Sequence, residues 1–277
     1  MSPVPPGLED AFQSLLEVVQ YPLEHSEAFA HLNIEAPKGV LLYGPPGVGK
    51  THLVRAISDH CSAHLTVIQG PEILGPYLGD SERRLRERFL EATKETQTRP
   101  SILFIDEIDS LAPSRNSDVS SARLVAQLLT LMDGLVKNAG RRLVVIGATN
   151  RPNALDAALR RPGRFDREIS IDVPDQQARS RMLVHFLSSM PHCVDIEQLA
   201  NATTGYVAAD LAALCRESAL LAINRRSRCQ YSESKSLSSY ATKPKLEMSD
   251  FVAAMRVTVA STRRGLSVDV AETRWTD

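Results

Sequence analysis

The apolar residues in the first part of the chain fall into short, nearly continuous runs. Residues 40–43, 102–105 and 143–146 form three such runs, which are typical of parallel strands buried on both faces. Residues 65–69 form a further strand candidate, and residues 169–171 alternate apolar and polar positions as an edge strand does. The pattern predicts the strands of one sheet.

The segments between and before these runs have apolar residues at helical spacing. Apolar residues recur along one face within residues 8–19 and again within residues 85–92, and residues 50–60 also suit a helix. Strands that alternate with helices predict a doubly wound, parallel α/β sheet.

The pattern changes near residue 175 and becomes helical up to about residue 223, with a further helix at 248–255. Residues 225–245 are rich in Ser, Lys and Arg and lack periodicity, which predicts a mobile loop. We therefore expect an α/β nucleotide-binding subdomain at 1–175 and a small α-helical subdomain at 176–262.

Composition narrows the class of protein. The formal net charge is −1, with 32 basic and 33 acidic residues, so the bulk positive charge of a nucleic-acid-binding protein is missing and direct nucleic-acid binding is not expected. No apolar run approaches the ~20 residues of a membrane span. The four cysteines lack zinc-finger or C-x-x-C spacing, which favours reduced thiols in a cytoplasmic or nuclear protein.

A glycine-rich segment follows the first predicted strand and precedes a predicted helix. It fits the phosphate-loop pattern G-x-x-x-x-G-K-[ST], in which backbone N–H groups curl around phosphate oxygens. Lys50 can reach the β- and γ-phosphates, and the Thr51 hydroxyl can ligate Mg²⁺. The expected ligands are ATP and Mg²⁺, bound by Gly44, Pro45, Pro46, Gly47, Val48, Gly49, Lys50 and Thr51.

Two carboxylates end the buried run at 102–105. Asp106 can hold Mg²⁺ through water, and Glu107 can polarise the attacking water as a general base. The alternative is a strand followed by a solvated acidic turn. Asp109 is more consistent with local capping or pairing than with catalysis.

Asn150 ends the next strand. Ligands of a parallel sheet bind at the carboxyl ends of its strands, so Asn150 can reach the γ-phosphate or its water; a turn-forming role is an equal alternative. Residues 160–167 contain four arginines, which suit either a solvated basic turn or an arginine finger. A finger supplied in trans requires an oligomer.

Tyr77 and Leu78 lie between two glycines. Composition does not separate a hydrophobic anchor from an exposed gripping loop at this point.

Taken together and in order, these segments resemble an AAA ATPase. The closest likeness is to the first ATPase module of tandem-ring proteins such as valosin-containing protein and the spermatogenesis-associated ATPases. The likeness covers almost the whole chain. Its most specific motifs are those at 44–51, 105–109, 128–134, 148–152, 159–168 and 208–217.

The resemblance implies six-membered rings, of one or more kinds of subunit, with ATP at the subunit interfaces. Asn150 would be the first sensor, and Arg161 and Arg164 would be fingers that reach the neighbouring subunit's ATP. Tyr77 and Leu78 would sit on the loop that drags polypeptide through the central pore. Residues 176–262 would form the helical lid, with Ala208 and Ala209 beside the adenine.

The function implied is Mg²⁺-dependent hydrolysis of ATP to ADP and phosphate, used to unfold, extract or remodel protein substrates brought by adaptors. Members of the family act on ribosome-maturation or ubiquitin-linked complexes. The alternative is an ATP-binding module that assembles a ring but hydrolyses weakly, and Ala208, where the family usually has Gly, favours it. A DNA-directed motor is a weaker third hypothesis. Residues 263–277 resemble a linker towards a second ATPase module that the chain lacks.

Overall fold

The computed structural model describes residues 4–24, 31–32, 37, 39–75, 77, 79–96, 99–114, 119–136, 143–232 and 245–262. The chain divides into two compact units. The first comprises Met1–Pro45 with Lys50–Asp172, and the second comprises Pro46–Gly49 with Val173–Asp277. The expected boundary was at residue 175; the sequence did not indicate that residues 46–49 group with the second unit.

The first unit is built on a five-stranded sheet in the order β2-β3-β4-β1-β5. All four strand pairs are parallel, as expected for a doubly wound fold. β3 is buried along almost its whole length, and β5 lies at an edge, as the alternating pattern predicted. The strands are β1 (Gly39–Tyr43), β2 (His64–Gln69), β3 (Ser101–Asp106), β4 (Leu143–Thr149) and β5 (Phe165–Ser170).

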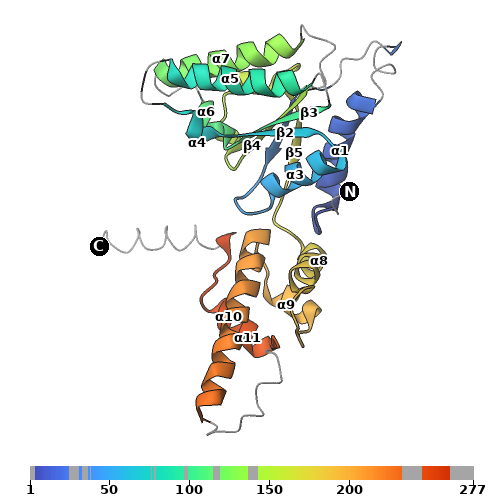
Figure 1. The fold of residues 1–277 in the computed structure, drawn as a ribbon, viewed down its shortest axis with the longest axis vertical. Coiled ribbons are helices and arrows are strands. Elements are labelled where there is room, and N and C mark those ends of the chain that lie inside the picture. Colours follow the sequence, from blue (N-terminus) through green and yellow to red (C-terminus); the bar gives the residue numbers. More distant parts are fainter. Residues whose placement is uncertain are drawn as a thin grey trace, which may run out of the picture. The chain divides into compact units, whose positions relative to one another are not determined.

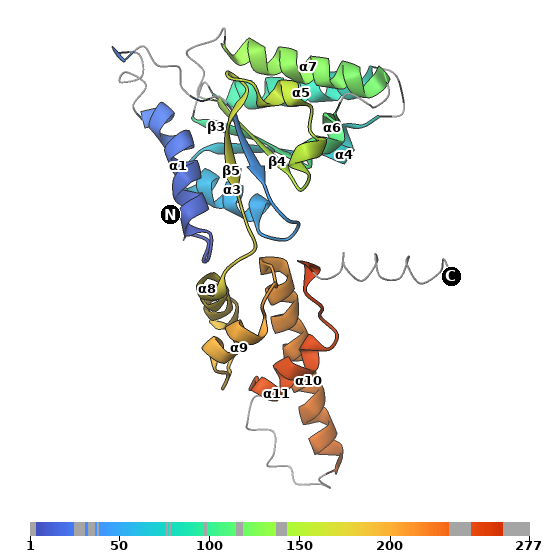
Figure 2. The same cartoon turned by 180° about the vertical axis from the view of Figure 1, so that it is seen from behind.

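Helices cover both faces of this sheet (Figures 1 and 2). α5 (Asp80–Glu95) and α7 (Val119–Val136) pack on one face, where residues such as Leu41, Leu103 and Val145 join them in one core cluster. α1 (Glu9–Glu24) and α3 (Lys50–His60) lie on the other side. Because successive side chains of a strand point to opposite faces, a strand buried on both faces reads as a continuous apolar run.

Shorter elements connect the strands to these helices. They were not predicted, because four residues are too few for a helical period to emerge. They are α4 (Gly70–Ile73), α6 (Ile108–Leu111) and the 3₁₀ turns Pro152–Ala154 and Ala157–Arg160. α6 begins directly after the two carboxylates that end β3, so the backbone turns sharply at Glu107.

The second unit contains four described helices: α8 (Gln176–Leu187), α9 (Ile196–Ala202), α10 (Ala208–Ser232) and α11 (Met248–Met255). Aspartates cap the first two of them: the Asp175 side chain accepts a hydrogen bond from the Ala178 N–H, and Asp195 caps α9 in the same way. Among the described helices of the chain, none is long and apolar enough to cross a membrane.

The expected loop at 225–245 is wrong at its start, because α10 continues to Ser232. No Gly or Pro interrupts the sequence between Ala208 and Ser232, so nothing ends the helix where the apolar stripe fades. Arg225 also anchors this part of α10, since it forms ion pairs with Glu247 and Asp250 at 2.6 and 3.0 Å. Residues 233–244 lie outside the described residues.

Core packing of the sheet can be tested with one pair of matched substitutions. Leu103 is fully buried, whereas Leu90 is 52% exposed on α5. Leu103→Ala should lower the free energy of unfolding by about 2–5 kcal/mol, because it leaves a cavity in the core. Leu90→Ala should change it by no more than about 0.5 kcal/mol. Urea unfolding followed by circular dichroism measures both, and equal losses would contradict the packing described.

Candidate functional site

The phosphate-loop segment adopts backbone conformations that favour glycine. Gly44, Gly47 and Gly49 have φ values of +153°, +80° and +108°. A Cβ atom at Gly44 would lie 2.0 Å from the carbonyl oxygen of Ile171, so no larger residue fits there. The glycines of the sequence motif therefore have a structural reason: they allow the chain to turn tightly where β1 ends.

Lys50 is buried at the start of α3, with 7% of its surface exposed. Its Nζ donates hydrogen bonds to the carbonyl oxygens of Gly44 and Pro45, both at 2.9 Å, and to Oδ1 of Asn150 at 2.6 Å. Burial lowers the pKa of Lys50, while the charges of Asp106 and Asp109 act in the opposite direction. Asn150, whose role the sequence left open, is thus in direct contact with the phosphate-loop lysine.

Thr51 and Asp106 form the second contact of the site. The Thr51 hydroxyl donates to Oδ2 of Asp106 at 2.7 Å. A hydroxyl and a carboxylate are hard oxygen ligands of the kind that Mg²⁺ prefers, and the pair fits that ion. Within the described part of the chain, no group of three or more His, Cys, Asp or Glu residues is suited to hold a metal. An ion here would take its remaining ligands from phosphate and water.

Glu107 is exposed and adopts a left-handed backbone conformation, with φ 52° and ψ 47°. Its N–H donates to Oδ1 of Asp106 at 3.1 Å. Non-glycine residues with this conformation are uncommon, and such strained residues cluster at functional sites. Glu107 and Asp106 thus lie at the same sharp turn after β3, and the bond between them involves the backbone N–H of Glu107 and not its carboxylate.

Asp109 pairs with a residue 40 positions away in the chain, whereas the sequence had suggested a local partner. Its Oδ1 accepts a hydrogen bond from the Thr149 hydroxyl at 2.7 Å, and the same hydroxyl accepts from the Arg151 N–H at 2.9 Å. These bonds flank Asn150 on both sides in sequence. The sequence did not predict that Asp109 and Thr149 bond beside Asn150. The only indication in the sequence is that a polar residue, Thr149, ends an otherwise apolar strand.

Ala208 and Ala209 begin α10 in the second unit, which also contains residues 46–49. The N–H of Ala209 donates to the carbonyl oxygen of Gly47 at 3.0 Å. A Cβ at Gly47 would lie 2.9 Å from the Ala209 Cβ and 3.1 Å from a Val207 methyl group. Two of the segments that the sequence assigned to nucleotide binding are thus in contact.

The two arginines assigned as fingers differ in their surroundings. Arg164 binds both carboxylate oxygens of Asp133 at 2.9 Å and donates to the Ala158 carbonyl oxygen at 2.7 Å, so its guanidinium is occupied within the subunit. Arg161 is exposed, and no hydrogen bond or ion pair of its guanidinium is found among the described residues. The sequence motif contains Asp133 but did not indicate this pairing.

Tyr77 is 75% exposed, which argues against the hydrophobic-anchor alternative. Leu78 lies outside the described residues.

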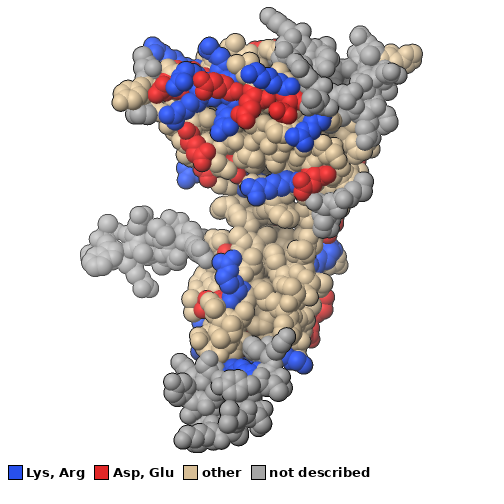
Figure 3. Space-filling view, in the orientation of Figure 1, with Lys and Arg blue, Asp and Glu red and all other residues tan. Residues whose placement is uncertain are grey.

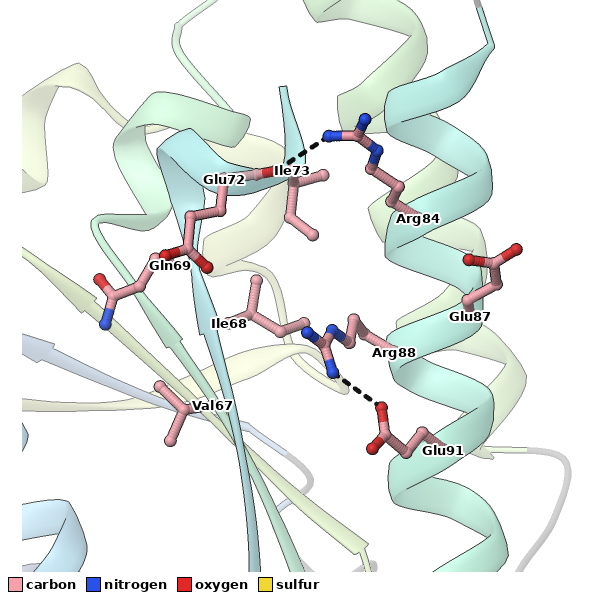
Figure 4. A pocket seen from close by; sticks show the side chains of 9 residues that line it. All are labelled: Val67, Ile68, Gln69, Glu72, Ile73, Arg84, Glu87, Arg88 and Glu91. Atoms are coloured by element: carbon pink, nitrogen blue, oxygen red, sulfur yellow. Dashed lines mark hydrogen bonds and ion pairs between the residues drawn. The ribbon is translucent and has the colours of Figure 1, made fainter. Parts of the chain in front are cut away.

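A separate pocket of about 310 Å³ lies between β2 and α5, away from the phosphate loop (Figure 4). Arg84 donates to the Glu72 carbonyl oxygen at 3.2 Å, and Arg88 pairs with Glu91 at 3.0 Å. Both signs of charge are interspersed over α5 on the face shown in Figure 3. β2 is an edge strand of the sheet, and charged side chains beside an edge strand oppose pairing with another chain.

Comparison with known proteins agrees with this geometry. Residues 40–173 match the model of the ATPase family associated with various cellular activities (AAA), and residues 193–238 match the AAA+ lid domain. The chain belongs to the AAA ATPase family. The predicted fold, an AAA α/β subdomain followed by a helical lid, is confirmed, and so is the predicted membership of an ATPase family.

Several relatives match over nearly the whole chain. The chain is 46% identical to the cell division cycle protein 48 homolog of Archaeoglobus fulgidus, covering 98% of this chain and 37% of that protein. It is 45% identical to protein SAV of Sulfolobus acidocaldarius, with 98% and 35% covered. It is 43% identical to the human ATPase family gene 2 protein homolog A, with 98% and 30% covered. The AAA chain thus spans about a third of the length of these relatives.

The different surroundings of Arg161 and Arg164 predict different effects on stability. Arg164→Ala removes a bidentate pair and a bond to a carbonyl group, and should cost about 1–2 kcal/mol of unfolding free energy. Arg161→Ala serves as the matched control and should leave the melting temperature within a degree or two of the wild-type value. Differential scanning calorimetry measures both; equal melting temperatures would contradict the Arg164 contacts.

Proposed function

We propose that this AAA module hydrolyses ATP to ADP and phosphate with Mg²⁺ and acts in a hexameric ring that remodels protein substrates. One observation carries the proposal. Residues far apart in sequence meet in two short contacts, Lys50 with Asn150 and Thr51 with Asp106. They are the charged, polar and metal-ligating groups that phosphoryl transfer requires.

The binding step uses the phosphate loop. Its backbone N–H groups and the Lys50 ammonium bind the β- and γ-phosphates; the carbonyl groups and Asn150 that now hold Lys50 keep it in the loop until phosphate replaces some of them. Thr51 and Asp106 would hold Mg²⁺, which neutralises the charge that builds up on the phosphate oxygens.

The chemical step is attack of water on the γ-phosphorus. The bond from that phosphorus to the oxygen bridging it to the β-phosphate breaks, and the electron pair stays with ADP. Glu107 takes the proton of the attacking water, and Asn150 orients that water or a γ-phosphate oxygen. The exposed carboxylate of Glu107, free of the Thr51–Asp106 contact, supports this division of roles.

Arg161 would complete the neighbouring subunit's site. Its exposed guanidinium is available to a phosphate of another subunit, which supports a ring as the active form. Arg164, the second finger that the resemblance implies, would have to leave Asp133 before it reached a neighbour.

The remodelling of protein substrates is supported by an exposed aromatic side chain of this chain. The exposed ring of Tyr77 is a large apolar surface with few rotatable bonds, which suits a loop that grips polypeptide together with Leu78. The expected partners are hexamer subunits, protein substrates and adaptors in the cytoplasm or nucleus. Ribosome-maturation or ubiquitin-linked complexes are the substrate classes that the resemblance suggests.

Steady-state ATPase assays on Glu107→Gln test the hydrolytic role. The variant should bind Mg²⁺-ATP but lose turnover by about 10²-fold or more, because the proton acceptor is gone. Glu91→Gln, which changes a solvent-exposed ion pair on α5, is the control and should keep wild-type turnover. High turnover in Glu107→Gln would exclude Glu107 as the base. Wild-type turnover as low as that of the variant would favour the ring-assembly alternative.

Mixed rings test the role of Arg161 in trans. Arg161→Ala alone should bind ATP almost normally yet hydrolyse it roughly 10³-fold more slowly. A Glu107→Gln subunit has no active site of its own but still carries Arg161, so mixing the two variants should restore part of the activity. Absence of any recovery in rings shown by native mass spectrometry to contain both subunits would contradict the assignment.

A further inference from the structure

The segment that follows α11 folds back onto the first turn of α10. In Figures 1 and 2 the red end of the described chain lies beside the start of this helix. The Ser261 hydroxyl donates to Oδ1 of Asp210 at 2.6 Å, and the Ser261 N–H donates to Oδ2 at 2.8 Å. Asp210 is only 4% exposed. A buried carboxylate that accepts two short bonds forms a strong local attachment.

Further contacts hold the same segment. The Tyr206 hydroxyl donates to the Thr258 carbonyl oxygen, and the Thr262 hydroxyl donates to the Gly205 carbonyl oxygen at 2.8 Å. Gly205 has φ +83°, and a Cβ there would lie 2.9 Å from the Thr262 hydroxyl oxygen. Residues 258–262 are therefore fitted closely to the turn that leads into α10; we call them the return segment.

Asp210 also binds the backbone at the start of its own helix. Its Oδ2 accepts from the Val207 N–H at 3.3 Å, which fixes the backbone at the start of α10. The neighbouring Val207 methyl group and the Ala209 N–H are the groups that meet Gly47. A continuous set of contacts thus joins Gly47 to the return segment, and Asp210 is the residue common to both sides.

We propose that Asp210 is a positioning residue that couples nucleotide binding at the phosphate loop to docking of the return segment. This inference rests on the proposed function, since it takes the nucleotide site as given. Nucleotide that fixes the backbone at Gly47 stabilises the first turn of α10 and, through Asp210, the attachment of Ser261. Coupling of binding free energies is reciprocal, so loss of the attachment must weaken nucleotide binding by the same factor.

Through this coupling the second unit would respond to nucleotide as well as contact its adenine. The return segment directly precedes residues 263–277 in the sequence. Whether nucleotide is bound would therefore change how firmly residues 258–262 are attached.

The test uses ADP as the probe, the full chain and two variants at the attachment. Ser261→Ala removes the hydroxyl donor, and Asp210→Asn removes the charge while keeping a side chain of the same size. Ser180→Ala is the matched control: the Ser180 hydroxyl also donates to a carboxylate, Glu197 at 2.9 Å, in the same unit. Isothermal titration measures the Kd for ADP, and hydrogen exchange followed by mass spectrometry measures protection of residues 256–262.

In the wild type and in Ser180→Ala, ADP should slow exchange in the return segment. In Ser261→Ala and Asp210→Asn, that protection should be reduced and the Kd for ADP raised by about five-fold or more, the lower end of typical coupling between sites. A merely structural attachment would speed exchange equally with and without ADP and leave the Kd unchanged.

Two results would overturn the proposal. One is a wild-type protein that binds ADP without any change of exchange in residues 256–262. The other is a folded Ser261→Ala variant whose Kd matches that of Ser180→Ala. A wild-type protein that binds no ADP at all would instead overturn the proposed function on which this inference rests.

Discussion

The buried ammonium of Lys50 is the constraint on which the rest of the site depends. A positive charge removed from water is unfavourable unless oxygens surround it, and two backbone carbonyls and one amide do so here. Those three oxygens come from the turn after β1 and from the end of β4, two adjacent strands of the sheet. The Lys50 charge therefore links the phosphate loop to the end of β4. β3, which ends in Asp106, is the next strand of the sheet beyond β4.

Much of the first unit is predictable from sequence because its sheet is parallel and buried. Continuous apolar runs such as that at Ile102–Ile105 give the strands directly, and Asp106 and Glu107 mark where one of them ends. The pairings of side chains are not predictable in this way. Arg164 with Asp133 and Thr149 with Asp109 join residues about 30–40 positions apart, and only the fold determines which neighbours meet.

The helical lid is harder to derive than the sheet for a different physical reason. The last two turns of α10, after Arg225, carry few apolar residues, so its apolar periodicity fades before the helix ends. The same applies to Asp210, which belongs to a recognisable family motif but whose partner, Ser261, is 51 residues away. A sequence motif can identify a residue such as Asp210, but its contact with a residue 51 positions away is seen only in the folded structure.

The place of β1 inside the sheet, between β4 and β5, has a consequence for how the protein is made. β1 pairs with β4 and β5, both of which follow it by about a hundred residues or more, and Gly44 packs directly against Ile171. While the chain leaves the ribosome, residues 39–43 have no strand to pair with until β4 has emerged, and the phosphate loop has no wall until residue 171 has followed. The apolar strand β1 thus stays without its partner strands, and the glycine-rich loop without its contact to Ile171, through much of synthesis. Because Lys50 is also held by Asn150, the phosphate site is complete only after most of the first unit has been made.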